Sequence, residues 1–287
     1  MIANSHVSIW ACPVCQSALT LIPQQEWRCE NNHSFDIAKE GYTNLLLAHQ
    51  KSSSDPGDTK MMAASRRAFL SAGHYQPLAK KLIEMLNHHL KPEASVLDSG
   101  CGEGYYLQQL MEQRSDLRLF GIDISREAAK LASRQLKGPT IAVASSFNLP
   151  VLPGSVDALL RVFAPGDIEE VTRVLIPDGV FVVVSPGPQH LFSLKSLIYK
   201  EAQKHTPPDR PKGFRLLDEQ QVNYQLEIKG NDAVKQLLSM TPFYWKGDRA
   251  AKAQLDDSDM LNTEIDFVIR VYQPIKNEVW GRASIKQ

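Results

Sequence analysis

The sequence lacks long apolar runs. None of its stretches approaches the roughly 18 consecutive apolar residues that a membrane-spanning helix needs, although hydrophobic residues make up 43% of the 287 positions. The first residues, Met1 to Val7, also lack the positive and continuous apolar segments of a secretory signal. We therefore expect a cytoplasmic protein with no membrane partner.

Charge of one sign is not in excess either, because 32 basic and 32 acidic residues balance to a formal net charge of zero. Whole-chain charge thus neither favours nor excludes a nucleic-acid partner, and phosphate contacts would require a local basic patch. Residues 186–215 offer one, with six Lys or Arg against two acidic residues. The same charge pattern is equally typical of a solvated helix face.

Cysteine is scarce, and its distribution is uneven. Three of the four cysteines lie in the first thirty residues, as Cys12-x2-Cys15 and, after thirteen intervening residues, Cys29-x3-His33. Structural zinc prefers four thiolate or imidazole ligands in a tetrahedron, and two close pairs separated by a hairpin provide them. Two other histidines, at positions 6 and 49, compete as the fourth ligand but lack the paired spacing. We predict a structural Zn²⁺ site formed by these three cysteines and His33.

From residue 94 onward, short strands alternate with helices, which indicates an α/β fold with a mostly parallel sheet and helices on both faces. Strands are expected at 96–97, 117–122, 140–143, 156–162, 180–185, 219–229 and 264–272, and helices at 61–70, 77–90, 105–113, 126–136, 168–175, 191–204 and 232–240. The last strand is expected to run antiparallel to the rest, because no long helical crossover precedes it.

A glycine-rich turn follows the first of these strands and opens a helix. It reads Asp98-Ser99-Gly100-Cys101-Gly102-Glu103-Gly104. Glycines let the backbone turn sharply and approach a ligand closely. The third glycine comes one residue too early for the G-x-G-x-x-G loop that binds nicotinamide dinucleotides. The run instead resembles motif I of class I (Rossmann-like) methyltransferases, which implies S-adenosylmethionine (SAM) as cofactor.

The carboxyl ends of the parallel strands meet at one edge of the sheet, where ligands bind. Asp123 ends the second strand, where an acidic residue can hold both ribose hydroxyls or cap the next helix. Ser145 and Ser146 follow the third strand. Many class I methyltransferases have an acidic residue near this point to receive the adenine amino group, but this chain does not, so backbone amides near Ser146 are the expected contact. Together these motifs predict a nucleoside-type cofactor site.

Three further segments are distinctive, namely residues 35–46 (FDIAKEGYTNLL), 66–78 (RRAFLSAGHYQPL) and 186–191 (PGPQHL). Together with the cysteine-rich segment, they closely resemble the bacterial 23S rRNA (guanine-N1)-methyltransferases, a family of class I methyltransferases that carry a zinc module. The resemblance extends from Cys12 to about Tyr272, and overall similarity favours the Gram-negative type.

The resemblance implies that the enzyme is a homodimer, that its zinc module helps read RNA, and that its target is a guanine in a hairpin loop of domain II of 23S rRNA. It also implies that Tyr75 and His190 help bind the cofactor. His190 follows the fifth strand at the ligand edge, although a lone histidine is often only a surface residue. The expected cofactor contacts are therefore Tyr75, Asp98, Gly100, Gly102, Glu103, Gly104, Asp123, Ser145, Ser146 and His190.

On this basis the chain is expected to have four parts: a zinc-binding RNA-recognition module (1–37), a helical linker or lid (38–92), a SAM-dependent methyltransferase domain with a seven-stranded sheet (93–275) and a tail (276–287). Two other functions compete with rRNA methylation. One is methylation of a small metabolite, which would leave the zinc module without a purpose. The other is binding without turnover, which the intact glycines and Asp123 disfavour.

The chemistry requires removal of the proton on guanine N1, and so a base or a hydrogen-bond donor to O6. Only the neighbourhood of this group is predicted, at residues 161–165 and His190, and the catalytic residue is left unassigned.

Overall fold

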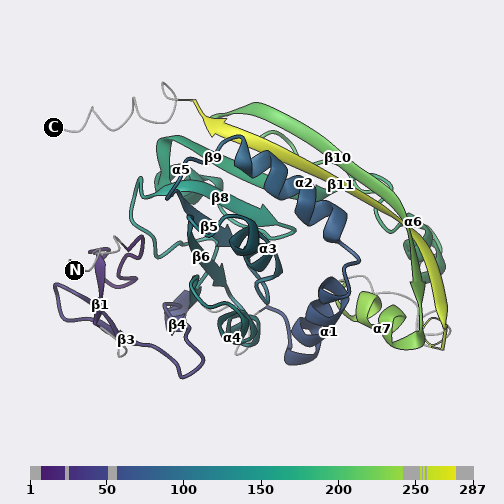
Figure 1. Ribbon diagram of the computed structural model, residues 1–287, viewed down its shortest axis with the longest axis horizontal. Coiled ribbons are helices and arrows are strands. Elements are labelled where there is room, and N and C mark those ends of the chain that lie inside the picture. Colours follow the sequence, from purple (N-terminus) through teal and green to yellow (C-terminus); the bar gives the residue numbers. More distant parts are fainter. Residues whose placement is uncertain are drawn as a thin grey trace.

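The computed structural model describes residues 8–22, 26–50, 57–241, 253, 255 and 257–275. Its main body is an eight-stranded sheet in the order β10-β11-β9-β8-β5-β6-β7-β4 (Figure 1). These strands are β4 (Thr43–Asn44), β5 (Ser95–Ser99), β6 (Arg118–Asp123), β7 (Thr140–Val143), β8 (Val156–Val162), β9 (Leu175–Pro186), β10 (Phe214–Lys229) and β11 (Met260–Pro274). β11 is antiparallel to both of its neighbours, and the remaining neighbours pair in parallel.

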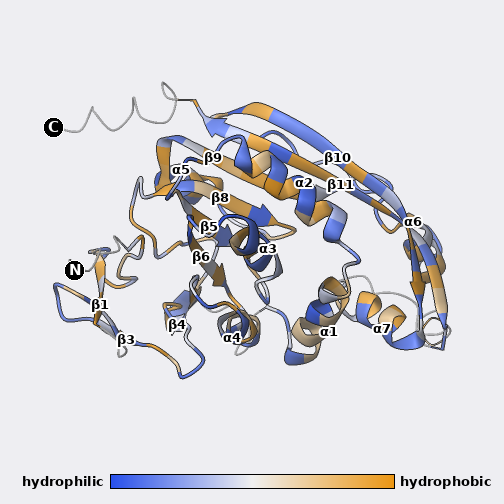
Figure 2. Cartoon of the chain, in the orientation of Figure 1, coloured by the Kyte–Doolittle hydropathy of each residue, from blue (hydrophilic) through white to orange (hydrophobic). Residues whose placement is uncertain are grey.

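This is the class I methyltransferase fold that the sequence predicts. All seven expected strands are present, and the short strand β4 adds an eighth at the edge beside β7. The antiparallel direction of β11 is confirmed. β10 and β11 carry alternating hydrophilic and hydrophobic bands in Figure 2, and alternate residues are buried in the second half of β10 and the first part of β11. The centre of β11 is buried on both faces. The expected tail at 276–287 lies outside the described residues.

Six of the described helices cover one face of the sheet, and α5 and the N-terminal module cover the other. The helices are α1 (Lys60–Ser71), α2 (Gln76–Asn87), α3 (Tyr105–Gln113), α4 (Arg126–Gln135), α5 (Ile168–Val174), α6 (Phe192–Ile198) and α7 (Asn231–Ser239), with a 3-10 turn η1 (Ala48–Gln50). Apolar residues of α1 to α4, α6 and α7 share one hydrophobic core with the sheet, and we call that side of the sheet the first face. Residues of α5 and the N-terminal module form the core on the second face.

Two elements differ from the sequence expectation. α6 ends at Ile198 instead of near residue 204, because Tyr199 adopts an extended backbone and the prolines at 207, 208 and 211 disfavour continuation of the helix. β9 begins at Leu175, where a turn was expected, because Leu175 pairs with Val156 of β8; the register then shifts, and pairing resumes between Ala158 and Val180. The segment from 199 to 213 therefore has no regular structure.

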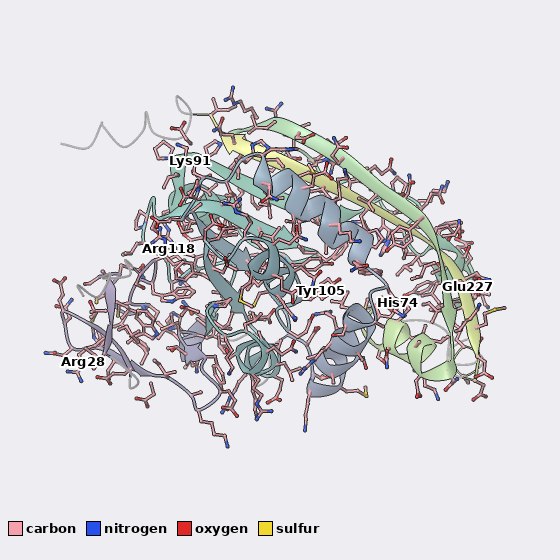
Figure 3. The ribbon with its side chains drawn as sticks, in the orientation of Figure 1. Arg28, His74, Lys91, Tyr105, Arg118 and Glu227 are labelled. Carbon is pink, nitrogen blue, oxygen red and sulfur yellow. The ribbon has the colours of Figure 1, made fainter. Side chains whose placement is uncertain are left out.

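The N-terminal module is a three-stranded antiparallel sheet of β1 (Leu19–Ile22), β2 (Glu26–Cys29) and β3 (Ser34–Asp36). It packs on the second face through Trp10, whose ring contacts Phe120 edge-on at 5.7 Å between centroids, and Trp10 also bridges to Val151. Figure 3 shows Arg28 of this module and Glu227 of β10 at opposite ends of the molecule. Among the described residues, no helix has both the length and the apolar character needed to cross a membrane.

Candidate metal centre and cofactor cavity

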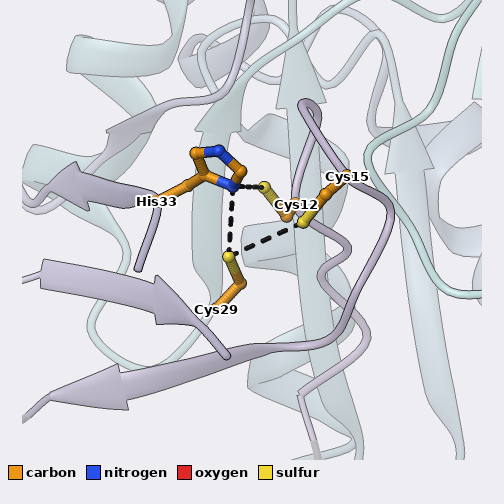
Figure 4. A group of neighbouring side chains, drawn as sticks. All are labelled: Cys12, Cys15, Cys29 and His33. Carbon is orange, nitrogen blue, oxygen red and sulfur yellow. Dashed lines mark hydrogen bonds between the residues drawn. The ribbon is translucent and has the colours of Figure 1, made fainter. Parts of the chain in front are cut away.

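The four predicted zinc ligands meet at one point (Figure 4), and their ligand atoms all lie within 4.8 Å of one another. The Sγ atom of Cys29 is 3.7 Å from Sγ of Cys15 and 3.4 Å from Nδ1 of His33, which is 3.6 Å from Sγ of Cys12. Zinc bonds of about 2.3 Å to sulfur and about 2.0 Å to nitrogen give tetrahedral edges of roughly 3.5–3.8 Å. The residues therefore fit one tetrahedral zinc ion, and the described residues contain no second group of this kind.

Two tight turns present these ligands. Gln16 and Asn32 adopt left-handed backbone conformations, and their amides donate to the carbonyls of Cys12 and Cys29 respectively. Hydrogen bonds to Ser17 and Asn31 lower the pKa of Cys15 to about 5, whereas burial raises the pKa of Cys12. A thiolate is the form that binds metal, so the environment of Cys15 favours the liganding state.

The glycine-rich loop between β5 and α3 depends on its glycines. Gly100, Gly102 and Gly104 have φ of +92°, +57° and +90°, and residues that carry a side chain rarely adopt such positive values. A Cβ on Gly100 would lie 2.3 Å from Cβ of Ala164, in the loop after β8. A Cβ on Gly104 would lie 2.8 Å from Leu136. The spacing of the motif thus brings the loop close to β8 and positions the start of α3.

Buried carboxyl groups surround this loop. Asp123 accepts hydrogen bonds from the amides of Gly102 (2.9 Å) and Ser125 (2.7 Å). Asp98 is 1% exposed, and neither of its carboxylate oxygens has a partner among the described residues. Burial raises the pKa of Asp98 and Asp123, and raises that of Glu103 to about 7; neighbouring acidic charges add to each shift. A cationic ligand would relieve this repulsion, so the group fits a sulfonium cofactor that also carries an ammonium.

His190 is held in a buried aromatic cluster. Its ring lies 4.6 Å from that of Phe267 and 6.0 Å from that of Phe163, against which it stacks. Its Nδ1 accepts from the backbone amide of Asp266 at 3.4 Å, and burial lowers the pKa of His190 to about 3. The imidazole is therefore neutral, and its proton is assigned to Nε2 because Nδ1 acts as acceptor.

Asp266 fixes the loop that carries His190. Its carboxylate accepts from the amide of Gln189 (2.9 Å) and from Nε2 of Gln221 (2.7 Å). A Cβ on Gly187 would lie 2.2 Å from Oδ1 of this carboxylate, so only glycine fits there. The segment Pro186-Gly187-Pro188-Gln189-His190 therefore forms a turn around the buried carboxylate of Asp266, and this turn requires the glycine.

One cavity of 1120 Å³ joins these parts along the carboxyl edge of the sheet. Eight of the ten predicted cofactor residues line it: Tyr75, Gly100, Gly102, Glu103, Asp123, Ser145, Ser146 and His190. Asp98 and Gly104 do not line it. Asp98 lies buried at the end of β5, and Gly104 caps α3.

The cavity also contains residues that the sequence analysis did not single out. Arg66 forms an ion pair with Asp58, and both line the wall next to Gly102. Arg66 belongs to the distinctive segment 66–78, which was one available signal. Arg270 lines the far end. The alternation of β11 gave the second signal, because it places Arg270 on the face opposite Phe267 and Ile269.

Comparison with known proteins agrees with both modules. A family model described as "RlmA, N-terminal" matches residues 10–54, and a "Methyltransferase domain" model matches residues 90–238. A protein of Streptomyces fradiae, named 23S rRNA (guanine(748)-N(1))-methyltransferase, is 32% identical over 83% of this chain and 86% of its own length. Similar putative 23S rRNA (guanine-N(1)-)-methyltransferases occur in Micromonospora griseorubida (34% identity, 64% of this chain and 67% of that protein) and in Bacillus subtilis (26%, 91% and 96%).

Proposed function

The chain belongs to the family of 23S rRNA (guanine-N1)-methyltransferases, and we propose that it transfers a methyl group from SAM to N1 of a guanine in 23S rRNA. The observation that carries this proposal is the presence of a Cys3His centre and a cofactor cavity in one chain, packed together through Trp10 and Phe120. A structural zinc centre adds nothing to methylation of a small metabolite, whereas an RNA substrate offers the module a surface to bind.

Within the cavity, we assign the cofactor's contacts to residues of the chain. Asp123 would hold the ribose hydroxyls, with the backbone at Ser145 and Ser146 beside the adenine. The glycine loop, Glu103, Tyr75 and His190 would surround the methionine part, supported by Asp98 and Gly104 from behind. When bound, SAM supplies an electrophilic methyl group, so the task of the protein is to hold the acceptor nitrogen in line with it.

The structure suits His190 to donate a hydrogen bond and not to act as a base, because its Nδ1 already accepts from the Asp266 amide. A donor to O6 of guanine would stabilise the negative charge that develops when the N1 proton leaves. Phe163 lines the same part of the cavity with 45% of its surface exposed. An exposed aromatic ring offers a stacking surface to an unpaired base, as single-stranded RNA recognition requires.

The finer features of the proposal follow the family resemblance. They are a target in a hairpin loop of domain II, a homodimer, the Gram-negative type of target and a cytoplasmic location. The division of the chain into modules 1–37, 38–92 and 93–275 is also retained, with β4 as the point where the second part joins the main sheet.

Transfer of labelled methyl from SAM to large-subunit rRNA, taken from a strain that lacks this activity, tests the proposal. The rRNA is digested to nucleosides after the reaction. We expect label in 1-methylguanosine. Label that appears only in a small-molecule fraction of a cell extract, with none in naked rRNA or immature ribosomal particles, would favour the alternative of a metabolite methyltransferase.

A further inference from the structure

The cavity continues past the cofactor loops onto the second face of the sheet. There Arg161 of β8 pairs in register with Val183 of β9, which pairs in register with Arg270 of β11. Residues in register share a face of the sheet, so the two arginines lie in one row, two strands apart. Both line the cavity, and five residues of the irregular segment line it as well, namely His205, Thr206, Pro208, Asp209 and Pro211.

Arg161 is a buried cation with incomplete hydrogen bonding. It is 7% exposed, and its Nε has no acceptor among the described residues. Its two terminal nitrogens make only long bonds, of 3.3 and 3.4 Å, to the carbonyls of Gly166 and Asp167. Burial lowers its pKa only to about 10, so it stays charged at neutral pH. Burying a charge without full hydrogen bonding is costly, which suggests that a ligand completes the site.

Two neighbouring residues also carry a buried polar atom without a hydrogen-bond partner among the described residues. Arg270 bonds to Glu219 through Nε, but its Nη1 has no acceptor among the described residues. Ser185 lines the same cavity from β9, and its hydroxyl also lacks a partner there. Three polar atoms from three adjacent strands therefore lie beside one cavity without a partner among the described residues: Nε of Arg161, Nη1 of Arg270 and the hydroxyl of Ser185.

We propose that Arg161, Ser185 and Arg270 form an anion subsite, which binds a backbone phosphate of the acceptor RNA beside the target guanine. The inference rests on the proposed function, because it takes RNA as the acceptor. Guanidinium groups bind phosphate through paired hydrogen bonds. Cα atoms two strands apart are separated by roughly 10 Å, a span across which two arginine side chains can converge on one phosphate. The carboxylate of the cofactor's methionine is the competing anion.

Arg270→Gln tests the subsite, with Arg134→Gln as matched control. Arg134 is also an arginine paired with a carboxylate, that of Glu40, but it lies on α4 away from the cavity. For each variant, RNA affinity is measured at several salt concentrations with a domain II hairpin fragment, and SAM affinity by calorimetry. We expect Arg270→Gln to weaken RNA binding by about 10-fold and to reduce the salt slope by about 1. SAM affinity should be unchanged, and the control should match the wild type.

Arg161→Lys provides a second variant, because it keeps the buried charge and removes only the planar fork. It should also lose RNA affinity and retain SAM affinity. The subsite is contradicted if Arg270→Gln binds RNA as the wild type does, or if Arg134→Gln loses as much. Loss of SAM affinity instead would assign the arginines to the cofactor carboxylate. A wild-type protein that forms no 1-methylguanosine would refute the proposed function itself, which is a separate result.

Discussion

At the residue scale, Glu103 links cofactor binding to pH. Burial raises its pKa to about 7, and the neighbouring Asp123 adds to the shift. A bound cation favours the ionised carboxylate, so cofactor affinity should rise as pH passes from about 5.5 to 7.5. Calorimetric titration with SAM measures this dependence. In Glu103→Gln the rise should be smaller, and an equally steep rise in this variant would assign the effect to another group.

His190 should make folding stability depend on pH in the acidic range. Its pKa is about 3 in the folded protein, against about 6.5 for an unperturbed histidine. As the pH falls below about 6.5, His190 of the unfolded chain binds a proton, whereas His190 of the folded protein does so only near pH 3. Burial of the neutral ring therefore contributes fully above about pH 6.5, and the contribution is lost as pH falls toward 3, at no more than about 1.4 kcal/mol per pH unit.

The comparison that isolates this effect is urea unfolding of the wild type and of His190→Gln, at about pH 7 and pH 5. The wild type should lose more unfolding free energy between the two pH values than the variant does. Equal losses would mean that His190 titrates normally in the folded protein.

Residue patterns predicted much of the site because backbone geometry restricts them. Three glycines with positive φ, and the two close Cys or His pairs, are required by local turns, so their spacing is visible in the sequence. Arg66, Arg161 and Arg270 reach the cavity from three separate elements. No local pattern records that convergence, so only the neighbourhood of Arg161 was predicted, and Arg66 and Arg270 were not.

At the element scale, the loop between β9 and α6 depends on a strand far away in sequence. In Asp266→Ala, the Gln189 amide and the Gln221 side chain would lose their acceptor. Gln189 and Gln221 are exposed residues, so each lost hydrogen bond should cost about 0.5–1.5 kcal/mol, and His190 would lose its fixed position. We expect lower thermal stability and a fall in kcat with SAM bound at saturation.

Glu227→Ala is the control for this change, because Glu227 pairs with Lys229 on the exposed end of β10. Exposed pairs contribute about 0–1 kcal/mol. A kcat for Asp266→Ala equal to that of the control would show that Asp266 does not position the loop for the reaction.

Strands and helices were predicted well where one periodicity extends over the whole element, as in β7, α3 and β8. The segment after α6 was predicted poorly, because its residues retain helical spacing up to 204 while the prolines that follow end the helix early. Strand β4 was not predicted, because two residues carry no periodicity and its pairing with β7 is set by tertiary contacts.

At the scale of the whole molecule, the N-terminal module with its zinc centre, which we call the zinc ribbon, contributes to the core on the second face and is not a separately folded unit. Trp10 and Trp27 share that core with Phe120, an arrangement that cysteine spacing alone does not predict. Removal of zinc should therefore unfold the ribbon and expose Trp10.

A chelator, or Cys12→Ser, should abolish methyl transfer to rRNA while the cavity keeps its affinity for SAM. Tryptophan fluorescence should shift as Trp10 becomes exposed. Re-addition of Zn²⁺ to the chelated wild type should restore both signals, whereas Cys12→Ser should not recover. Full rRNA methylation by a zinc-free protein would contradict a role for the ribbon in substrate binding.

Mapping of the modified nucleotide in cells tests the central claim most directly. A methyl group on N1 blocks the base-pairing edge of guanine, so reverse transcriptase stops next to it on extracted 23S rRNA. A strain deleted for this gene should lack one stop at a guanine. The wild-type gene should restore that stop, and an Asp123→Ala gene should not. An identical pattern of stops in the deleted and wild-type strains would contradict the assignment of this protein as a 23S rRNA guanine-N1 methyltransferase.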